Sequence, residues 1–411
     1  MGVYDGHWLP VSTPNPNSAP FRSRRSLWLL ALAATLPAQA PRLRLGPTTL
    51  SGQMNLVWQG YPAFPAAYSG PLSLPAAGEF RNTRVFTLMS ATRVSSAWRI
   101  HLDLEAANGR PLGGATGLAG IANLDVTRNL VDSLLPSIYL ARLYAERHRG
   151  GATLRIGRLD LADYFDQNAV LGDDHRQFLN WSTNVQPAWD YAADTRGYTD
   201  AVEFSSGAWR LAYALMPRTP NGMRLDWNSS SLMAQRQFAW PGATVRLFAY
   251  ANHARLGQYD QAATSVDAHH RWLWKQGAGL SLDCRLAPRL RLGARLGTNN
   301  DAVEDYANTE AENSASVGLA ARAGANRWGA ALASNGLSAA HAAYLARGGL
   351  GFLLGDGALR YGRETIAEFY WTRPLGAFAS WGPDLQWIRN PGYNRDRGPV
   401  LVLGWRVHAD L

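Results

Sequence analysis

The last residues of the chain alternate between apolar and polar side chains. Between Leu401 and Leu411 the odd positions are apolar, whereas Arg406, His408 and Asp410 fall on the even positions. Because side chains alternate across a β-strand, this pattern predicts a strand with one apolar and one largely polar face. A soluble sandwich also contains such strands. A strand that ends the chain and repeats a pattern found upstream favours the closing strand of a transmembrane barrel, with lipid outside and water inside.

The same alternation recurs through most of the chain. It is strict in residues 289–297, where Arg289, Arg291 and Arg295 alternate with apolar residues, and in residues 98–105. It predicts further strands at residues 50–59, 84–94, 137–147, 153–158, 201–205, 209–215, 244–252, 277–286, 314–323, 328–334, 358–362, 365–373 and 383–389. Short connections alternate with long polar segments, as turns and loops do in outer-membrane barrels. At about 10 residues per strand plus connections, we expect an all-β, antiparallel up-and-down transmembrane barrel of roughly 16 strands.

Two long segments lack the alternation. Residues 108–123 are glycine-rich and carry no phosphate-loop signature, so they are predicted to be a loop. Residues 159–194 contain Phe165, Phe178, Trp181, Trp189 and Tyr191, which is too aromatic for a disordered segment. We expect this second segment to fold against another part of the chain, and the inside of a barrel is available to it.

Composition excludes some classes of protein and leaves others open. The chain has no apolar run near 20 residues, which excludes transmembrane helices. Its net charge is +9, but the basic residues (39 Arg and the single lysine, Lys275) are dispersed and often lie on the polar parity of strands. This favours a basic lumen over a nucleic-acid-binding patch. Cys284 is the only cysteine, so a disulfide framework and a cysteine zinc site are excluded.

The N-terminal residues have the features of an export signal. A basic Arg22-Ser-Arg-Arg25 precedes the apolar residues 27–36 and an Ala38-Gln-Ala40 site, which predicts a secretory signal peptide cleaved near Ala40. We therefore expect a leader at residues 1–40 and a single barrel domain at residues 41–411. Pro41 leaves the exact peptide bond that is cleaved open, and the long stretch before Arg22 leaves the true start codon open.

Several short motifs follow one another along the mature chain. They are Gly52-Gln53, Tyr68-Ser-Gly70, Gly157-Arg-Leu-Asp-Leu-Ala-Asp-Tyr-Phe-Asp166, Phe178-Leu-Asn-Trp181, Ala188-Trp-Asp-Tyr191, Thr195-Arg-Gly-Tyr-Thr199 and Asn390-Pro-Gly-Tyr-Asn-Arg-Asp-Arg-Gly-Pro399. In this order they resemble the OprB-type carbohydrate-selective porins of bacterial outer membranes. The resemblance implies a 16-stranded barrel with in-folded loops that narrow a passive sugar pore. The chain departs from the barrel pattern by ending in Leu411, where outer-membrane barrels usually end in Phe.

The candidate functional residues lie in the second long segment and on the polar faces of strands. Two roles are open for Asp160, Asp163 and Asp166. They are structural if their carboxylates accept hydrogen bonds from backbone N–H groups. If they are functional, they and Arg158 would form hydrogen bonds with sugar hydroxyls in a constriction. The flat aromatic rings of this segment could stack on sugars, but packing within the loop explains the presence of each ring equally well. The full set of substrate-binding or pore-lining candidates is Arg158, Asp160, Asp163, Asp166, Trp181, Trp189, Asp190, Arg289, Arg291 and Arg295.

These observations predict an outer-membrane porin for passive uptake of mono- or oligosaccharides. An exporter of an acidic polysaccharide is the alternative suggested by the basic faces, and a membrane hydrolase is a third. No Ser-His-Asp or HExxH arrangement is apparent, and His269-His270 has no third ligand nearby, so we expect no catalytic site, cofactor or metal. The expected partners are sugars, outer-membrane lipid, the barrel-assembly machinery and, where it oligomerises, further copies of the chain; nucleic acid is not among them.

Overall fold

The computed structural model describes residues 42–125, 137–262, 265–266, 270–300, 302–306 and 310–411. All of them belong to one compact unit, Ala34–Leu411. The predicted signal peptide lies outside the described residues.

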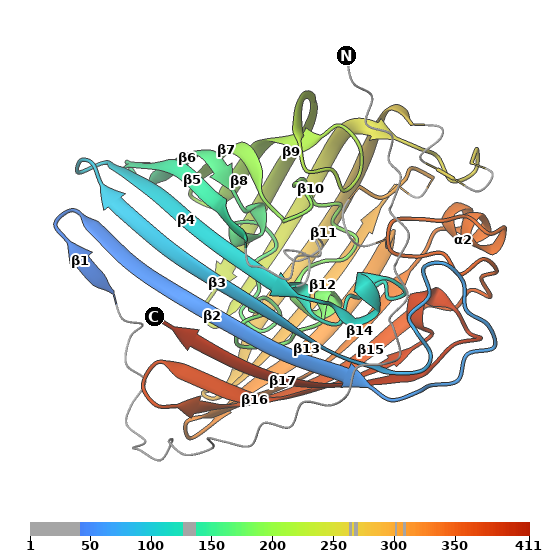
Figure 1. Ribbon diagram of the computed structural model, residues 1–411. Coiled ribbons are helices and arrows are strands. Elements are labelled where there is room, and N and C mark those ends of the chain that lie inside the picture. Colours follow the sequence, from blue (N-terminus) through green and yellow to red (C-terminus); the bar gives the residue numbers. More distant parts are fainter. Residues whose placement is uncertain (1–41, 126–136, 263–264, 267–269, 301, 307–309) are drawn as a thin grey trace. The chain divides into compact units, whose positions relative to one another are not determined.

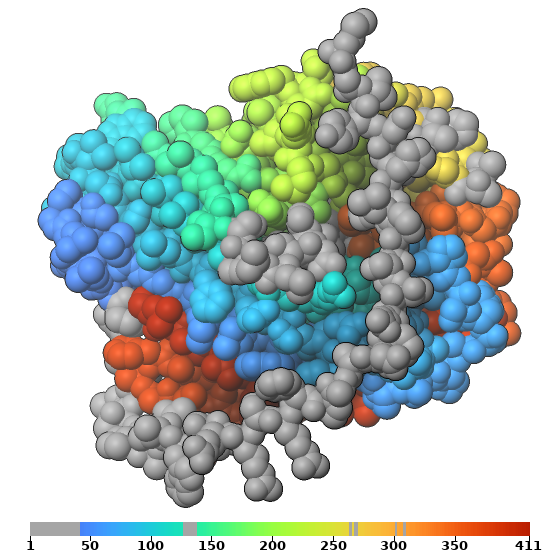
Figure 2. All heavy atoms as spheres, viewed as in Figure 1, coloured from blue at the N-terminus to red at the C-terminus, as the bar shows by residue number. Residues whose placement is uncertain are grey.

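Sixteen antiparallel strands form a closed barrel (Figure 1). Each strand from β2 to β16 pairs with the next, and β17 pairs back with β2, with Asp410 opposite Gln53. Figure 2 shows β2 and β17, blue and red, side by side on the outer face. The strands are β2 (Thr48–Tyr61), β3 (Glu79–Arg93), β4 (Trp98–Gly109), β5 (Ser137–Arg149), β6 (Ala152–Leu159), β7 (Thr199–Ser206), β8 (Trp209–Pro217), β9 (Leu225–Trp240), β10 (Ala243–Leu256), β11 (Arg271–Ala287), β12 (Leu290–Asn299), β13 (Asn313–Ala323), β14 (Asn326–Gly336), β15 (Glu364–Leu375), β16 (Ala379–Arg389) and β17 (Val400–Asp410). The predicted fold class is confirmed.

An additional strand lies outside the closed barrel. β1 (Leu43–Leu45) pairs with the first residues of β2, with Leu45 opposite Thr48. Its sequence did not predict it, because three residues are too few to display an alternation.

Short and long connections alternate along the barrel, as predicted. At one end the strands are joined by tight turns, several with glycine at positive φ, such as Gly150, Gly207 and Gly324. At the other end lie the long loops, which hold η1 (Leu112–Ala115), η3 (Leu161–Asp163), α1 (Trp181–Asn184), α2 (Ala339–Ala346) and η5 (Pro391–Tyr393). Among the described residues, neither α-helix has the length and apolar character that a membrane-spanning helix needs.

The alternation of β17 separates an inner from an outer face. Leu401, Leu403 and Trp405 are exposed on the outside, whereas Arg406 and His408 are each 2% exposed on the inside. Burial of polar residues beside exposed leucines inverts the usual arrangement of a soluble protein. It is the arrangement expected when lipid surrounds the barrel.

Two strand predictions were wrong. β9 was missed because its faces mix residue types: Arg236 is exposed on the outer face, and Met233 is buried on the inner face. Residues 358–362 were predicted as a strand, but they form a loop in which only Tyr361 makes an isolated bridge, to Asn394. Gly355 and Gly357 at positive φ, just before this short run, prevent an extended strand from starting there.

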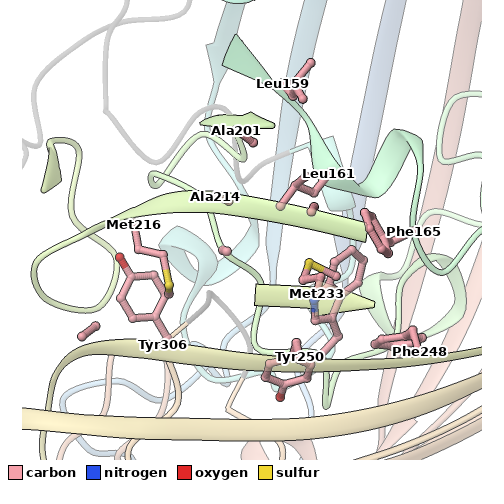
Figure 3. Packing of buried hydrophobic residues seen from close by; sticks show 14 of the residues in the cluster. Leu159, Leu161, Phe165, Ala201, Ala214, Met216, Met233, Phe248, Tyr250 and Tyr306 are labelled. Atoms are coloured by element: carbon pink, nitrogen blue, oxygen red, sulfur yellow. The ribbon is translucent and has the colours of Figure 1, made fainter. Parts of the chain in front are cut away.

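The largest apolar core fills the inside of the barrel. Leu161, Phe165 and Trp189 from the long loop after β6 pack against Met233, Phe248 and Tyr250 on the inner faces of β9 and β10 (Figure 3 labels all of these except Trp189). At Met233, Phe248 and Tyr250 the inward side chain is apolar because a loop, and not water, covers it.

Candidate pore constriction

Two in-folded loops meet inside the barrel. One comprises residues 110–125 of the β4–β5 connection, and the other comprises residues 160–198 between β6 and β7. The Trp181 backbone N–H donates to the Ile121 carbonyl at 2.9 Å, and Leu124 N donates to the Leu179 carbonyl at 2.9 Å. The Asn180 side-chain amide donates to the carbonyl of Gly120 at 3.1 Å. Backbone pairing therefore joins the two loops into one constricting layer.

The first loop is fixed to the barrel wall by buried polar side chains. The Ala122 carbonyl accepts hydrogen bonds from Gln59 at 2.9 Å and from Gln386 at 2.8 Å. The carboxylate of Glu364 accepts from the backbone of Ala119 at 3.0 Å and of Gly120 at 2.6 Å. The sequence predicted only a glycine-rich loop for this segment. Its contacts come from strands far along the chain, so no local signal could have placed it in the lumen.

Glycine is required where the loops touch. A Cβ added at Gly120 would lie 2.4 Å from Ser182 Oγ and 2.8 Å from Asn180 Oδ1, closer than nonbonded atoms can approach. Any larger residue at position 120 would separate the two loops.

The second loop is fixed by another buried carboxylate. Glu368 accepts hydrogen bonds from the backbone of Leu179 at 2.5 Å and of Asn180 at 3.1 Å, and from Thr183 Oγ1 at 2.6 Å. Farther along the loop, Asn252 Nδ2 donates to the carbonyl of Asp190 at 2.7 Å. The loop that the sequence predicted to fold into the barrel therefore does so, and inward polar side chains hold it there.

A cavity of about 250 Å³ lies at this constriction. Five aspartates line it, together with two arginines, Trp181, Trp189, Tyr191 and Asn184. Six of the ten sequence candidates are among the lining residues: Asp160, Asp163, Asp166, Trp181, Trp189 and Arg295.

Arginine side chains neutralise most of the carboxylates in this wall. Arg295 Nε lies 2.8 Å from Asp166 Oδ2, with both side chains 2% exposed. Arg142 Nε lies 2.8 Å from Asp163 Oδ2, and its Nη2 lies 3.5 Å from Asp160 Oδ2. Arg142 was not among the residues predicted from the sequence, because it lies on β5 and is distant from the aspartates in sequence.

Several polar atoms of the cavity-lining side chains have no protein hydrogen-bond partner among the described residues. Trp181 Nε1, Trp189 Nε1 and Asn184 Oδ1 are among them. Trp189 is held by an edge contact with Tyr191, at a ring-centroid distance of 4.9 Å. Two indole N–H donors and one amide acceptor are therefore buried within the cavity wall without a protein partner.

The remaining candidates lie outside the cavity lining. Arg158 pairs with the lining residue Asp194. Asp190 accepts from the backbone of Tyr306 at 2.5 Å and so fixes a neighbouring loop. Arg289 lies in the tight turn before β12, and Arg291 is exposed on the inner face near the same end.

Asp160 also has a structural role. Its side chain accepts from Ala162 N at 2.9 Å and caps η3, as an aspartate at this position commonly does. Asp160 therefore caps η3 while its side chain also lines the cavity.

Two clusters have the ligand types of a metal site. Asp125, Asp174 and His175 form one, and Asp305, Glu312 and His341 form the other. In the second, the ammonium group of Lys275 lies 3.0 Å from Asp305, and His341 lies 2.7 Å from Glu312. A buried ion-pair network that joins the long loops accounts for this cluster.

Comparison with known proteins agrees with the fold. Residues 287–411 match the family model described as the carbohydrate-selective porin, OprB family. A high-pH structure of Pseudomonas putida OprB is similar over 89% of this chain and 94% of its own, with 14% identity and a TM-score of 0.66. The outer-membrane channel DcaP of Acinetobacter baumannii is similar over 89% and 97%, with 11% identity and a TM-score of 0.56. No curated protein sequence matches the chain.

Proposed function

We propose that this chain is an outer-membrane porin of the OprB kind, through which small neutral sugars diffuse passively. The match of residues 287–411 to that family supports the proposal, as does the closed barrel with an apolar outer face. The observation that carries it is the cavity at the constriction, whose wall combines paired charges with unpaired indole and amide groups.

Charge pairing in the wall favours a neutral solute. A carboxylate already paired with an arginine, such as Asp166 with Arg295, exerts a weak field on a passing ion but still offers lone pairs to hydroxyl groups. The N–H groups of Trp181 and Trp189 and the Oδ1 of Asn184 have no protein partner, so a solute that reaches them can exchange hydrogen bonds with them as it sheds water.

The size of the site favours a small solute. Pockets for drug-sized ligands are typically about 300–1,000 Å³, and this cavity is about 250 Å³. The backbone contacts between Trp181 and Ile121 hold the constriction at that size. A sugar of one or two rings suits the space better than a folded polymer chain does.

The test is conductance of the refolded chain in planar bilayers, with and without added solutes. Stable single-channel steps that neutral mono- or disaccharides block in a concentration-dependent way are the expected result. Trp189→Phe, which keeps the ring but removes the indole N–H, should weaken this block. Trp405→Phe, an outward-facing change, is the matched control.

Two outcomes would overturn the proposal. Block by uronic-acid oligomers without block by neutral sugars would favour the export channel for an acidic polysaccharide. Absence of conductance from a correctly folded barrel would exclude both channel functions, and a lipid-hydrolysis assay would follow.

A further inference from the structure

Four exposed arginines lie at the end of the barrel that carries the long loops, where Figure 1 shows α2. Arg389 ends β16, and Arg363 immediately precedes β15. Arg360 and Arg395 lie in the adjoining loops, and all four residues are exposed. We call these four residues the rim patch.

The register places Arg389 on the outer face. On β16, the inward residues Asp384, Gln386 and Ile388 are buried, whereas Trp387 is 41% exposed and Arg389 is exposed. Alternation along the strand therefore directs Trp387 and Arg389 toward the surroundings of the barrel and away from the lumen.

Arg363 lies flat against the outside of the neighbouring strands. Its Nε donates to Ser334 Oγ at 2.8 Å, its Nη2 to the Ser334 carbonyl at 3.1 Å, and its Nη1 to Asn313 Oδ1. A Cβ added at Gly336 would lie 2.2 Å from Nη1, so the glycine makes room for the guanidinium group. The side chain is thus fixed in position by neutral partners that leave its charge uncompensated.

Hydrogen bonds to backbone carbonyls connect the segments that carry the four arginines. Asn390, which follows Arg389, donates its side-chain N–H to the Arg363 carbonyl at 3.0 Å. Arg395 N donates to the Arg360 carbonyl at 2.9 Å. Arg395 also packs over Gly362, where an added Cβ would lie 2.8 Å from its Nε.

The patch carries excess positive charge. In the part of the chain that the structure describes, the acid paired with this patch is Asp396, which lies 2.9 Å from Arg360. Glu364, although next to Arg363 in sequence, is fully buried on the inner side and bonded to backbone N–H groups. Fixed guanidinium groups without acidic partners suit phosphate, which they bind through paired N–H donors.

We propose that the rim patch binds the phosphate groups of a glycolipid in the outer leaflet of the membrane. The inference rests on the outer-membrane placement proposed above, in which the long loops face outside. Trp387, two residues before Arg389 on the same outward face, is the kind of side chain that lies at the headgroup boundary. The patch is therefore at the level of the lipid phosphates, where basic clusters recognise anionic headgroups.

The test measures binding of lipid A to the full-length mature protein in detergent, by native mass spectrometry. The double variant Arg363→Gln/Arg389→Gln should bind lipid A roughly tenfold more weakly, because it loses two charge-assisted contacts. Arg373→Gln is the matched control, since Arg373 is exposed on the same outward face of β15 but at the end with the tight turns. It should bind lipid A as the unmodified protein does.

Two further measurements identify the ligand and distinguish a failure of this proposal from a failure of the proposed pore function. Dephosphorylated lipid A should bind about as weakly to the unmodified protein as lipid A binds to the double variant. Conductance and sugar block should be unchanged in the double variant, because Arg363 and Arg389 face away from the lumen. If neither the unmodified protein nor any variant conducts, the proposed pore function is contradicted, but the lipid-binding result still stands.

Three results would overturn the rim-patch proposal. They are equal binding of phosphorylated and dephosphorylated lipid A, equal loss in Arg373→Gln, and displacement of lipid A by an equal concentration of inorganic phosphate. The last would identify a free-anion site in place of a lipid site.

Discussion

Glu364 and Glu368 lie four residues apart on the inner face of β15, and each holds a different in-folded loop. Glu364 accepts hydrogen bonds from the backbone of Ala119 and Gly120, and Glu368 from the backbone of Leu179 and Asn180. Both carboxylates are buried, at 0% and 2% exposure. One strand therefore anchors both loops of the constriction, and its two acids can be tested separately.

Replacing Glu368 with alanine should release the second loop. The change leaves two backbone N–H groups and the Thr183 hydroxyl without their buried acceptor, and each such loss costs about 1–3 kcal/mol. Single-channel conductance should rise severalfold and sugar block should weaken. Glu368→Gln, which keeps one acceptor oxygen, should give a smaller rise; unchanged conductance in Glu368→Ala would contradict the anchoring role.

Adding a methyl group at Gly120 should open the contact between the loops. The new Cβ would lie 2.4 Å from Ser182 Oγ, so the loops must move apart or the barrel must strain. Noisier and larger current steps are the expected result in bilayers. Gly114→Ala is the control within the same loop: its Cβ meets nothing within 4 Å, and the change costs only about 1–2 kcal/mol of backbone strain at φ +67.

The pair Asp166–Arg295 should be strongly coupled. Removing one member of a buried ion pair leaves an uncompensated charge and typically costs about 3–5 kcal/mol, whereas replacing both costs less. Asp166→Asn and Arg295→Met should each lower thermal stability more than the double variant does. The measurement is the unfolding temperature of the folded barrel. If the stability lost in the double variant equals the sum of the losses in the two single variants, the two side chains act independently.

A second arginine cluster should make the channel prefer anions. Arg285 lies opposite Arg291, and Arg322 lies opposite Arg327, on the inner face near the tight turns. Like charges placed directly opposite one another repel, so this wall attracts small anions. Replacing all four arginines with glutamine should shift the reversal potential in a KCl gradient in the direction of lower anion selectivity. Arg236→Gln is the control, because Arg236 lies on the outer face over Trp209, and it should leave the reversal potential unchanged.

The packing of the loop after α2 should depend on pH near neutrality. Burial raises the pKa of Glu310 to about 7 from 4.5, and Oε1 of this residue accepts from Phe352 N at 2.6 Å. The folded state thus holds a proton that the unfolded chain releases. Glu310 therefore contributes stability that is full below pH 4.5 and is lost as pH rises through about 7. Hydrogen exchange near Phe352 should be faster at pH 8.5 than at pH 5.5, and Glu310→Gln should remove the difference.

The strands could be predicted from the sequence because each one faces lipid on one side and the barrel interior on the other. Apolar and polar residues therefore alternate with a period of two along each strand. Where the pattern failed, a local exception explains it. On β10 the inward Phe248 and Tyr250 are apolar because the second loop covers them. On β9 the outward Arg236 is accommodated between Trp209 and Phe238 by cation–π contacts.

The sequence by itself determined the closed antiparallel barrel, the alternation of turns and loops, and the existence of an aromatic segment that folds inward. It could not determine that a second loop joins that segment, or that Arg142 pairs with Asp163. Nor could it place Glu364 and Glu368 beneath the two loops. Alternation is a local property of each strand, whereas these contacts join residues tens to hundreds of positions apart. They form only when the sheet closes, so the tertiary structure alone decided how the pore is constricted.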